Sequence, residues 1–139
     1  MPQQILVNID VDDLQGATAF YRAAFGLDLG RRLGDDVVEL TGGSSPIYLL
    51  RRAAGTGATP AGAPSGDIRR YTRHWTPVHL DFVVDDLDEA LARALRAGAT
   101  LEQPASTSAW GRLALLSDPF GHGVCLVQFL GRGYDELSG

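Results

Sequence analysis

The sequence predicts an α+β fold made of two βαβββ modules, and an internal repeat is the main evidence. The segment VNIDVDDL (Val7 to Leu14) returns as LDFVVDDL (Leu80 to Leu87). Each copy has the alternation of a half-buried strand and then runs through Asp-Asp-Leu into a segment with helical apolar spacing. Short strands follow each helix and end in IYLL (Ile47 to Leu50) or VCLV (Val124 to Val127). Self-similarity over half the chain indicates a duplicated unit.

The first half reads as one strand, one helix and three further strands. Residues 4–11 alternate, with Ile5, Val7, Ile9 and Val11 on one side, which predicts a strand. Asp13 is a good N-cap for the helix that follows, and Gly26 ends that helix. Turn signals then separate three strands, expected over 27–33, 37–40 and 46–51.

The second half repeats this order. We expect its first strand to start at Thr76, and Asp86 with Glu89 has the spacing of a capping box at the start of the helix. Gly98 ends that helix. Three strands should follow near 100–103, 112–117 and 123–130, with Asp118-Pro119-Phe120-Gly121 as the turn before the last. The tail from Gly131 is expected to be exposed.

The boundaries place a first module at 1–52, a connecting loop at 53–74 and a second module at 75–139, within one compact domain. The Ala-, Gly- and Pro-rich stretch from Ala53 to Gly66 is interpreted as a linker, and a lid over a pocket is the alternative. One helix for four strands covers only one face of each sheet. The other faces should curve and line a shared central cavity.

Composition narrows the classes of partner. The net charge of −5 and pI near 5.0 disfavour nucleic acid and anionic membranes. All twelve basic residues are Arg, so no lysine can form a Schiff base. The single cysteine, Cys125, excludes an internal disulfide and fits a reducing compartment. With no signal-peptide pattern and no apolar run of about 20 residues, we expect a cytoplasmic protein.

Several separated motifs resemble one superfamily. The doubled βαβββ unit, AFYRAAFGLDL (Ala19 to Leu29), Trp110-Gly111 and DPFGHGVCLVQF (Asp118 to Phe129) look like the vicinal oxygen chelate superfamily. It includes glyoxalases, bleomycin-resistance proteins, extradiol dioxygenases and fosfomycin-resistance enzymes. The resemblance extends from Ile5 to Leu130 and implies curved mixed sheets around a central cavity, and a homodimer. It leaves function open, because members are metal enzymes or metal-free drug binders.

The resemblance also implies where a metal would be bound. Metal-using members take ligands from the first and last strands of each half, and the corresponding residues here are Leu6, Tyr48, His79 and Cys125. Leucine cannot ligate a metal and tyrosine rarely does, whereas a divalent site needs carboxylates and imidazoles together. We therefore expect no metal and no other cofactor.

The remaining polar residues leave two interpretations of the pocket. His79 and Asp81 lie two apart on one strand and so share a face, where they could act as a general acid/base pair. Alternatively, His79 only hydrogen-bonds a ligand or a buried polar group. The residues expected to bind a ligand are Leu6, Asn8, Tyr48, Leu50, Trp75, Trp110, Arg112, Cys125, Val127 and Phe129.

Three functions follow from these residues. The first is binding of a small hydrophobic or aromatic molecule without metal. The second is a metal-free isomerase or lyase that uses His79 and Asp81. The third is a divalent-metal lyase or dioxygenase with an atypical site that includes His79 and Cys125.

Overall fold

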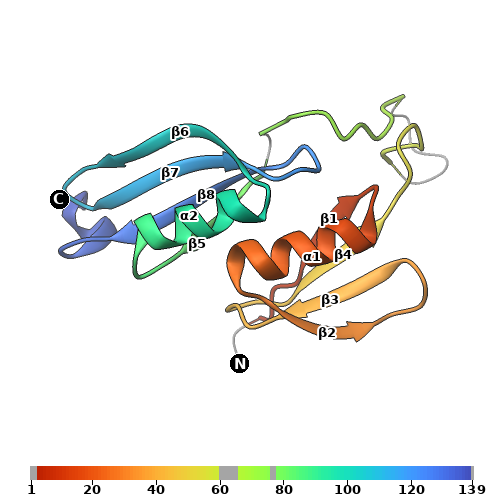
Figure 1. Ribbon diagram of the computed structural model, residues 1–139, viewed down its shortest axis with the longest axis horizontal. Helices are drawn as coiled ribbons and strands as arrows, with labels where there is room; N and C mark the ends of the chain where they lie inside the picture. The colour runs from red at the N-terminus through yellow and green to blue at the C-terminus, as the bar shows by residue number, and fades with distance from the viewer. Residues whose placement is uncertain (1–2, 60–65, 76–77, 139) are drawn as a thin grey trace. The chain divides into compact units, whose positions relative to one another are not determined.

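The computed structural model describes residues 3–59, 66–75 and 78–138 and divides into two units (Figure 1). The first unit is Met1–Arg22 with Gly26–Thr72, and the second is Ala23–Phe25 with Arg73–Gly139. Each unit carries one four-stranded mixed sheet. The predicted α+β fold with duplicated βαβββ modules is confirmed. No helix in these ranges is both long enough and apolar enough to cross a membrane.

The first sheet has the order β1-β4-β3-β2. Its strands are β1 (Val7–Val11), β2 (Asp28–Arg32), β3 (Val37–Thr41) and β4 (Ile47–Arg51), and α1 (Leu14–Phe25) follows β1. β1 and β4 run parallel, and the other pairs are antiparallel. The core of this unit is made by alternate strand residues and by the apolar side of α1, namely Val11, Val38, Leu40, Ile47, Leu49, Leu14, Ala17, Phe20 and Tyr21.

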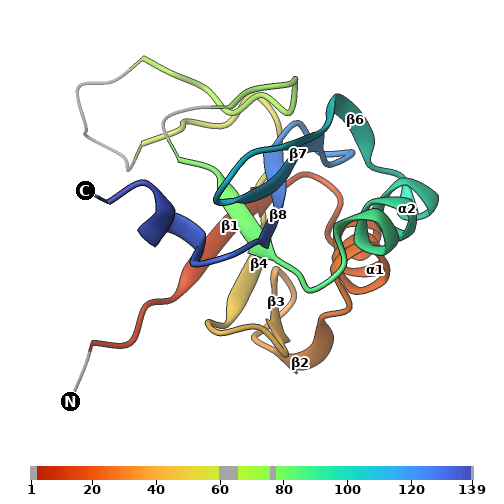
Figure 2. The same cartoon turned by 90° about the vertical axis from the view of Figure 1, so that its left-hand side faces the viewer.

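The second sheet repeats this arrangement in the order β5-β8-β7-β6. Its elements are β5 (Leu80–Val83), α2 (Leu87–Ala97), β6 (Thr100–Thr107), β7 (Gly111–Ser117) and β8 (Gly123–Phe129), and the 3-10 helix η1 (Gly133–Glu136) follows. α2 covers one face of this sheet (Figures 1 and 2). The strand expected from Thr76 begins later, at Leu80, because Val78 and His79 are not paired as strand; residues 76 and 77 lie outside the described ranges.

Strand register shows that the two halves are aligned as the repeat predicts. Asn8 pairs with Tyr48 between the parallel strands of the first sheet, and Asp81 pairs with Cys125 between those of the second. Asn8 and Asp81 are therefore equivalent positions, and so are Tyr48 and Cys125. Leu6 and His79, the first-strand positions that the superfamily uses, come two residues before these register partners of Tyr48 and Cys125.

Both helix starts and both helix ends are as the sequence predicts. The Asp13 carboxylate accepts a hydrogen bond from the Gly16 N–H at 2.9 Å, and the Asp86 carboxylate accepts one from the Glu89 N–H at 3.2 Å. Gly26 and Gly98 follow the helices with φ of 67° and 117°, in the left-handed region that glycine adopts without strain.

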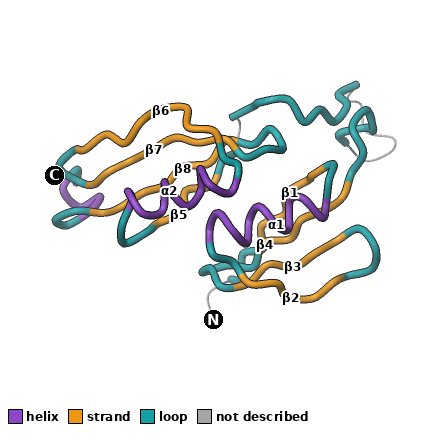
Figure 3. The backbone as a smooth tube through the Cα atoms, viewed as in Figure 1, coloured by secondary structure: helices purple, strands orange, loops and turns teal. Residues whose placement is uncertain are grey.

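The segment between the modules is paired with itself (Figure 3). Gly57 and Ile68 form an antiparallel bridge, and the Gly55 N–H donates to the Arg69 carbonyl at 2.8 Å. The Arg69 guanidinium then donates to the Asp10 carboxylate of β1 at 2.8 Å. The two ends of the connection are therefore joined to each other and anchored to the first sheet, whereas residues 60–65 lie outside the described ranges. Whether the segment acts as a lid stays a prediction.

Two elements of the second half differ from the expectation: β6 is longer, and the tail forms a short helix. β6 continues to Thr107, past the expected end at Gln103 and through Pro104. A proline is tolerated there because β6 is an edge strand, and its pairing with β7 shifts register between Gln103 and Ser106, the interval that contains the proline. The tail forms η1, in which Gly133 is buried beside the Phe129 ring.

Candidate functional site

One face of the second sheet collects half of the predicted ligand-binding residues. Cys125, Val127 and Phe129 alternate along β8 and therefore point to the same side. Their register partners on this side are Asp81 and Val83 of β5 and Leu113 and Leu115 of β7. We call this surface the Cys125 face. It lies opposite α2, because the alternate residue Gln128 accepts a hydrogen bond from the Leu87 N–H of that helix at 2.9 Å.

A polar cluster occupies one end of the Cys125 face. His79 Nε2 lies 3.2 Å from Asp81 Oδ1, and both side chains are partly exposed. The buried Cys125 is next to them, and the potential ligand atoms of His79, Asp81 and Cys125 all lie within 4.8 Å of one another. The sequence predicts that His79 and Asp81 share a face, and the short distance between them agrees with that prediction.

Cys125 is a thiol and not a thiolate at neutral pH. Burial, and then the negative charge of Asp81 and a hydrogen bond to it, raise the pKa of the Cys125 thiol to about 12. A reactive cysteine needs the opposite setting, with a nearby positive charge and access to solvent. Cys125 is therefore a packing residue in this environment.

The Trp75 side chain packs beside His79 of the polar cluster. Its ring lies on Gly123, where any Cβ would overlap it, and meets the His79 imidazole edge-to-face at 5.1 Å between centroids. The indole N–H donates to Glu102 at 2.7 Å, and Arg73 stacks on the indole with its guanidinium carbon 4.6 Å from the ring centroid. Arg73 also forms an ion pair with Glu102. Contacts with Gly123, Glu102 and Arg73 thus fix the position of the Trp75 ring beside His79.

An aromatic cluster occupies the other end of the Cys125 face. Tyr134 of η1 lies 5.0 Å from Trp110 and 4.9 Å from Phe129, measured between ring centroids. Phe129 and Tyr134 remain 40% and 52% exposed. The sequence predicts Trp110 and Phe129 but not Tyr134, since the tail was expected only to be exposed and carried no periodic signal.

Arg112 does not lie on the Cys125 face. It alternates with Leu113 on β7, so it lies on the α2 side of the sheet. There its guanidinium donates to Asp88 of α2 at 3.0 Å, and this ion pair raises the pKa of Arg112 and lowers that of Asp88.

The remaining predicted residues lie in the first unit. Asn8, Tyr48 and Glu39 form a register row across β1, β4 and β3, and Leu50 and Val37 form the next row on the same side. We call this surface the Tyr48 face. Leu6 lies just before β1 and is 50% exposed.

The Tyr48 face contains two polar residues that sequence reasoning missed. The Tyr48 hydroxyl donates to Glu39 Oε2 at 2.9 Å, and Arg31 donates to both carboxylate oxygens at 3.0 and 2.7 Å. These bonds lower the pKa of the buried Glu39 carboxyl to about 2. The available signal was a single acidic residue in an otherwise apolar central strand, VVELT.

The donors on these two faces do not match the superfamily's metal ligands. Leu6 has no lone pair, and the Tyr48 hydroxyl is bonded to an ionised Glu39. His79 and Cys125 remain, with Cys125 held as a thiol by burial and by Asp81. Asp81 adds one carboxylate beside His79, so this face offers one imidazole, one carboxylate and a protonated thiol. A catalytic divalent site usually takes three protein ligands that are free to bind, so these residues do not fit the metal that the fold family implies.

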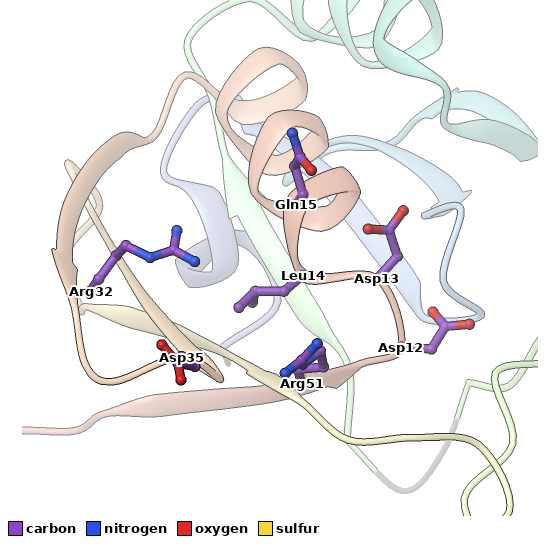
Figure 4. Close-up of a pocket in the computed structure, with 7 residues that line it drawn as sticks. All are labelled: Asp12, Asp13, Leu14, Gln15, Arg32, Asp35 and Arg51. Carbon is purple, nitrogen blue, oxygen red and sulfur yellow. The ribbon is translucent and has the colours of Figure 1, made fainter.

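Two hollows lie elsewhere in the first unit. One, of about 290 Å³, lies at the start of α1 and is lined by Asp12, Asp13, Leu14, Gln15, Arg32, Asp35 and Arg51 (Figure 4). The other, of about 350 Å³, is lined by Gln15, Thr18, Ala19, Arg22, Leu29 and Arg32. Neither includes a residue that the sequence predicts for the site.

Comparison with known proteins decides the family. A profile described as "Glyoxalase-like domain" matches residues 6–127, which is most of the chain. The chain belongs to the glyoxalase-like family. The predicted resemblance to the vicinal oxygen chelate superfamily is thereby confirmed, since solved structures of this superfamily share the fold.

Individual relatives of this glyoxalase-like protein are distant. It is 30% identical over 125 residues to the anthracycline biosynthesis protein DauV of Streptomyces sp. (strain C5), a match that covers 88% of this chain and 40% of that protein. It is 31% identical over 128 residues to the uncharacterized protein Mb0911c of Mycobacterium bovis, covering 85% and 78%. The chain therefore spans less than half of the Streptomyces relative.

Among solved structures, the glyoxalase-like protein resembles the fosfomycin resistance protein FosX of Listeria monocytogenes. The TM-score is 0.69 at 17% identity, over 94% of this chain and 95% of that one. At this identity the similarity establishes the fold alone.

Proposed function

We propose that this protein binds a small, planar hydrophobic molecule without the help of a metal. The observation that carries the proposal is the chemistry at the four positions where superfamily metals are bound. Leucine stands at one, and a tyrosine bonded to Glu39 stands at another. The third and fourth are His79 and a thiol with a raised pKa. Small-molecule binding in this fold does not need those ligands, only a shaped apolar surface with a few polar groups.

The Cys125 face supplies such a surface. Val83, Leu113 and Leu115 are apolar and at least partly exposed, Val83 by 61%, whereas Val127 between them is buried. The polar cluster lies at one end of these residues and the aromatic cluster at the other. Aromatic side chains favour stacked or edge-to-face contact with flat rings, so the Trp110, Phe129 and Tyr134 cluster suits a planar ligand.

The Streptomyces relative adds support for the ligand class. Its name assigns it to anthracycline biosynthesis, and anthracyclines are planar polycyclic molecules.

The proposal also includes a cytoplasmic location, which the lone thiol of Cys125 favours, and a homodimer, as expected for this superfamily.

The test is a titration with a tricyclic probe, 2-methoxyanthraquinone, followed by tryptophan quenching and by thermal shift. We expect saturable binding that is unchanged by EDTA, with well below one metal ion per purified chain. Phe129→Ala should weaken binding about tenfold by removing a stacking partner, whereas Leu137→Ala, at an exposed position after η1, should not. Absence of binding, or binding that requires a divalent ion, would refute the proposal.

A second candidate function rests on the 3.2 Å contact between His79 and Asp81. A positioned imidazole beside a carboxylate can move a proton to and from a substrate carbon or oxygen, as a metal-free isomerase or lyase requires. His79→Ala would then abolish turnover with little change in melting temperature. A large loss of stability in that variant would instead assign His79 a structural role.

A further inference from the structure

The Tyr48 face carries a group of three polar side chains that are hydrogen-bonded to one another. Arg31, Glu39 and Tyr48 come from three neighbouring strands, β2, β3 and β4. Arg31 donates to Glu39 through Nε and Nη2, and Tyr48 donates to the same carboxylate. Glu39 is buried, but the Arg31 side chain is 69% exposed and Tyr48 is half-buried, so the group lies at the surface of the sheet.

The direction of the Tyr48 hydrogen bond follows from the charges. Glu39 is ionised throughout the physiological range, because Arg31 and Tyr48 hold its pKa near 2. A carboxylate can only accept hydrogen bonds, so the Tyr48 proton must point at Glu39. The Tyr48 oxygen then offers only lone pairs to anything that approaches it from the surface. A carbonyl or ether oxygen would find no proton there, whereas a hydroxyl group would find an acceptor.

Two apolar side chains lie next to this acceptor on the same side of the sheet. Leu50 is two residues after Tyr48 on β4 and pairs with Val37 on β3. The third residue of this row, Asp10 of β1, is ion-paired with Arg69. An aromatic ring that rests on Leu50 and Val37 would therefore place a substituent at the neighbouring row. Asn8, the β1 partner of Tyr48, is exposed in that row and adds an amide that can donate and accept.

We propose that the Tyr48 oxygen, oriented by Glu39 and Arg31, selects planar ligands that carry a neutral aromatic hydroxyl group. Tyr48 is the residue that contacts the ligand, and Glu39 and Arg31 are positioning residues. The proposal rests on the proposed function, that this chain binds planar molecules, and it assigns the ones that carry a hydroxyl group to the Tyr48 face of the first unit. The Arg31 charge is balanced by Glu39, so the site favours an uncharged phenol over an anion.

The experiment compares two matched probes, 2-hydroxyanthraquinone and 2-methoxyanthraquinone, at a pH well below the pKa of the probe phenol. Only the first can donate a hydrogen bond. We expect the wild-type protein to bind the hydroxyl probe up to about tenfold more tightly, the upper end of the net contribution of one added hydrogen bond. Tyr48→Phe should abolish this preference and leave affinity for the methoxy probe unchanged.

Two further variants separate orientation from simple packing. Glu39→Gln offers Tyr48 an amide that can also donate, so the hydroxyl is no longer forced to point inward and the preference should shrink. Tyr71→Phe is the matched control, since the Tyr71 hydroxyl donates to the Arg52 carbonyl at 2.6 Å and is already occupied. It should keep the full preference for the hydroxyl probe.

The outcomes are distinct. Equal affinity for both probes in the wild type, with no change in Tyr48→Phe, overturns the inference and leaves planar-molecule binding intact. An equal loss for both probes in Tyr48→Phe also overturns it, because the ring and not the hydroxyl would then matter. Failure of the wild type to bind either probe refutes the proposed function, and the inference with it.

Discussion

Neighbouring charges and burial set the protonation states of single residues on the two sheet faces. At equivalent positions of the repeat, Tyr48 donates to an ionised Glu39, while Cys125 lies beside Asp81. Equivalent backbone positions therefore hold a tyrosine hydroxyl with a fixed hydrogen-bond direction in one sheet and an unreactive thiol in the other. Both states have consequences that can be measured without knowing the ligand.

The first prediction concerns the reactivity of Cys125. With a pKa raised to about 12, compared with about 8.5 for a free cysteine, its thiolate fraction at pH 8 is lower by about 10³-fold. Iodoacetamide should therefore modify the native protein about a thousandfold more slowly than the denatured chain. Mass spectrometry of timed samples measures both rates. Rapid alkylation of the native protein would contradict this description of the thiol.

The second prediction concerns acid and Glu39. Its pKa lies near 2 in the folded protein and near 4.5 ordinarily, so the unfolded chain takes up the proton first as pH falls. The stability from ionised Glu39 is thus present above about pH 4.5 and is lost as pH approaches 2. The difference in unfolding free energy between wild type and Glu39→Gln should shrink across this window.

Denaturant titrations at stepped pH measure that difference. Arg31→Met should remove most of the pH dependence, because Arg31 makes the largest contribution to the lowered pKa. A gap between wild type and Glu39→Gln that stays constant from neutral pH down to about pH 3 would count against the assignment.

At the level of elements, local sequence signals accounted for both helices and for most strand positions. The Asp caps and the terminal glycines act through bonds and backbone angles within a few residues, so they can be read from sequence. The misjudged elements depend on distant partners. β6 extends through Pro104 because β7 pairs with it, and η1 forms where Tyr134 meets Trp110 and Phe129. The connecting segment at 53–59 and 66–74 also has a distant partner, because its Arg69 donates a hydrogen bond to Asp10 of β1.

The third prediction tests a helix cap. Asp86→Ala removes the acceptor for the Glu89 N–H, and we expect it to lower the unfolding free energy by about 1 kcal/mol. Asp85→Ala is the control, since Asp85 is the neighbouring exposed acid that does not occupy the cap position. Urea titration of both variants gives the comparison. Equal losses would show that net charge, and not the cap, is responsible.

At the level of the whole molecule, duplication gives two sheets with the same strand order and different side-chain chemistry. The predicted residues Leu6, Asn8, Tyr48 and Leu50 belong to the first unit, and His79, Asp81, Trp75, Trp110, Cys125, Val127 and Phe129 belong to the second. Family membership is established, yet neither a metal requirement nor a ligand follows from it, because function depends on the residues grafted on the fold.

The fourth prediction concerns assembly. The superfamily resemblance leads us to expect a homodimer, with a mass of about twice the 14.8 kDa of one chain. Sedimentation velocity at micromolar concentration, with and without 2-methoxyanthraquinone, measures this mass. A single monomer boundary under both conditions would remove dimerisation from the proposed function.

The sequence by itself determined the fold class, the repeat and the helix caps. It also determined which positions of the two halves are equivalent, such as Asn8 and Asp81. Strand period and helix-end chemistry are local and recur in both halves, so both can be read from the sequence. Only the tertiary structure revealed that Glu39 and Arg31 engage Tyr48, that Arg112 turns toward Asp88, and that Tyr134 completes an aromatic cluster. Those outcomes depend on which strands become neighbours and in what register. A one-residue change of register would move each side chain to the opposite face.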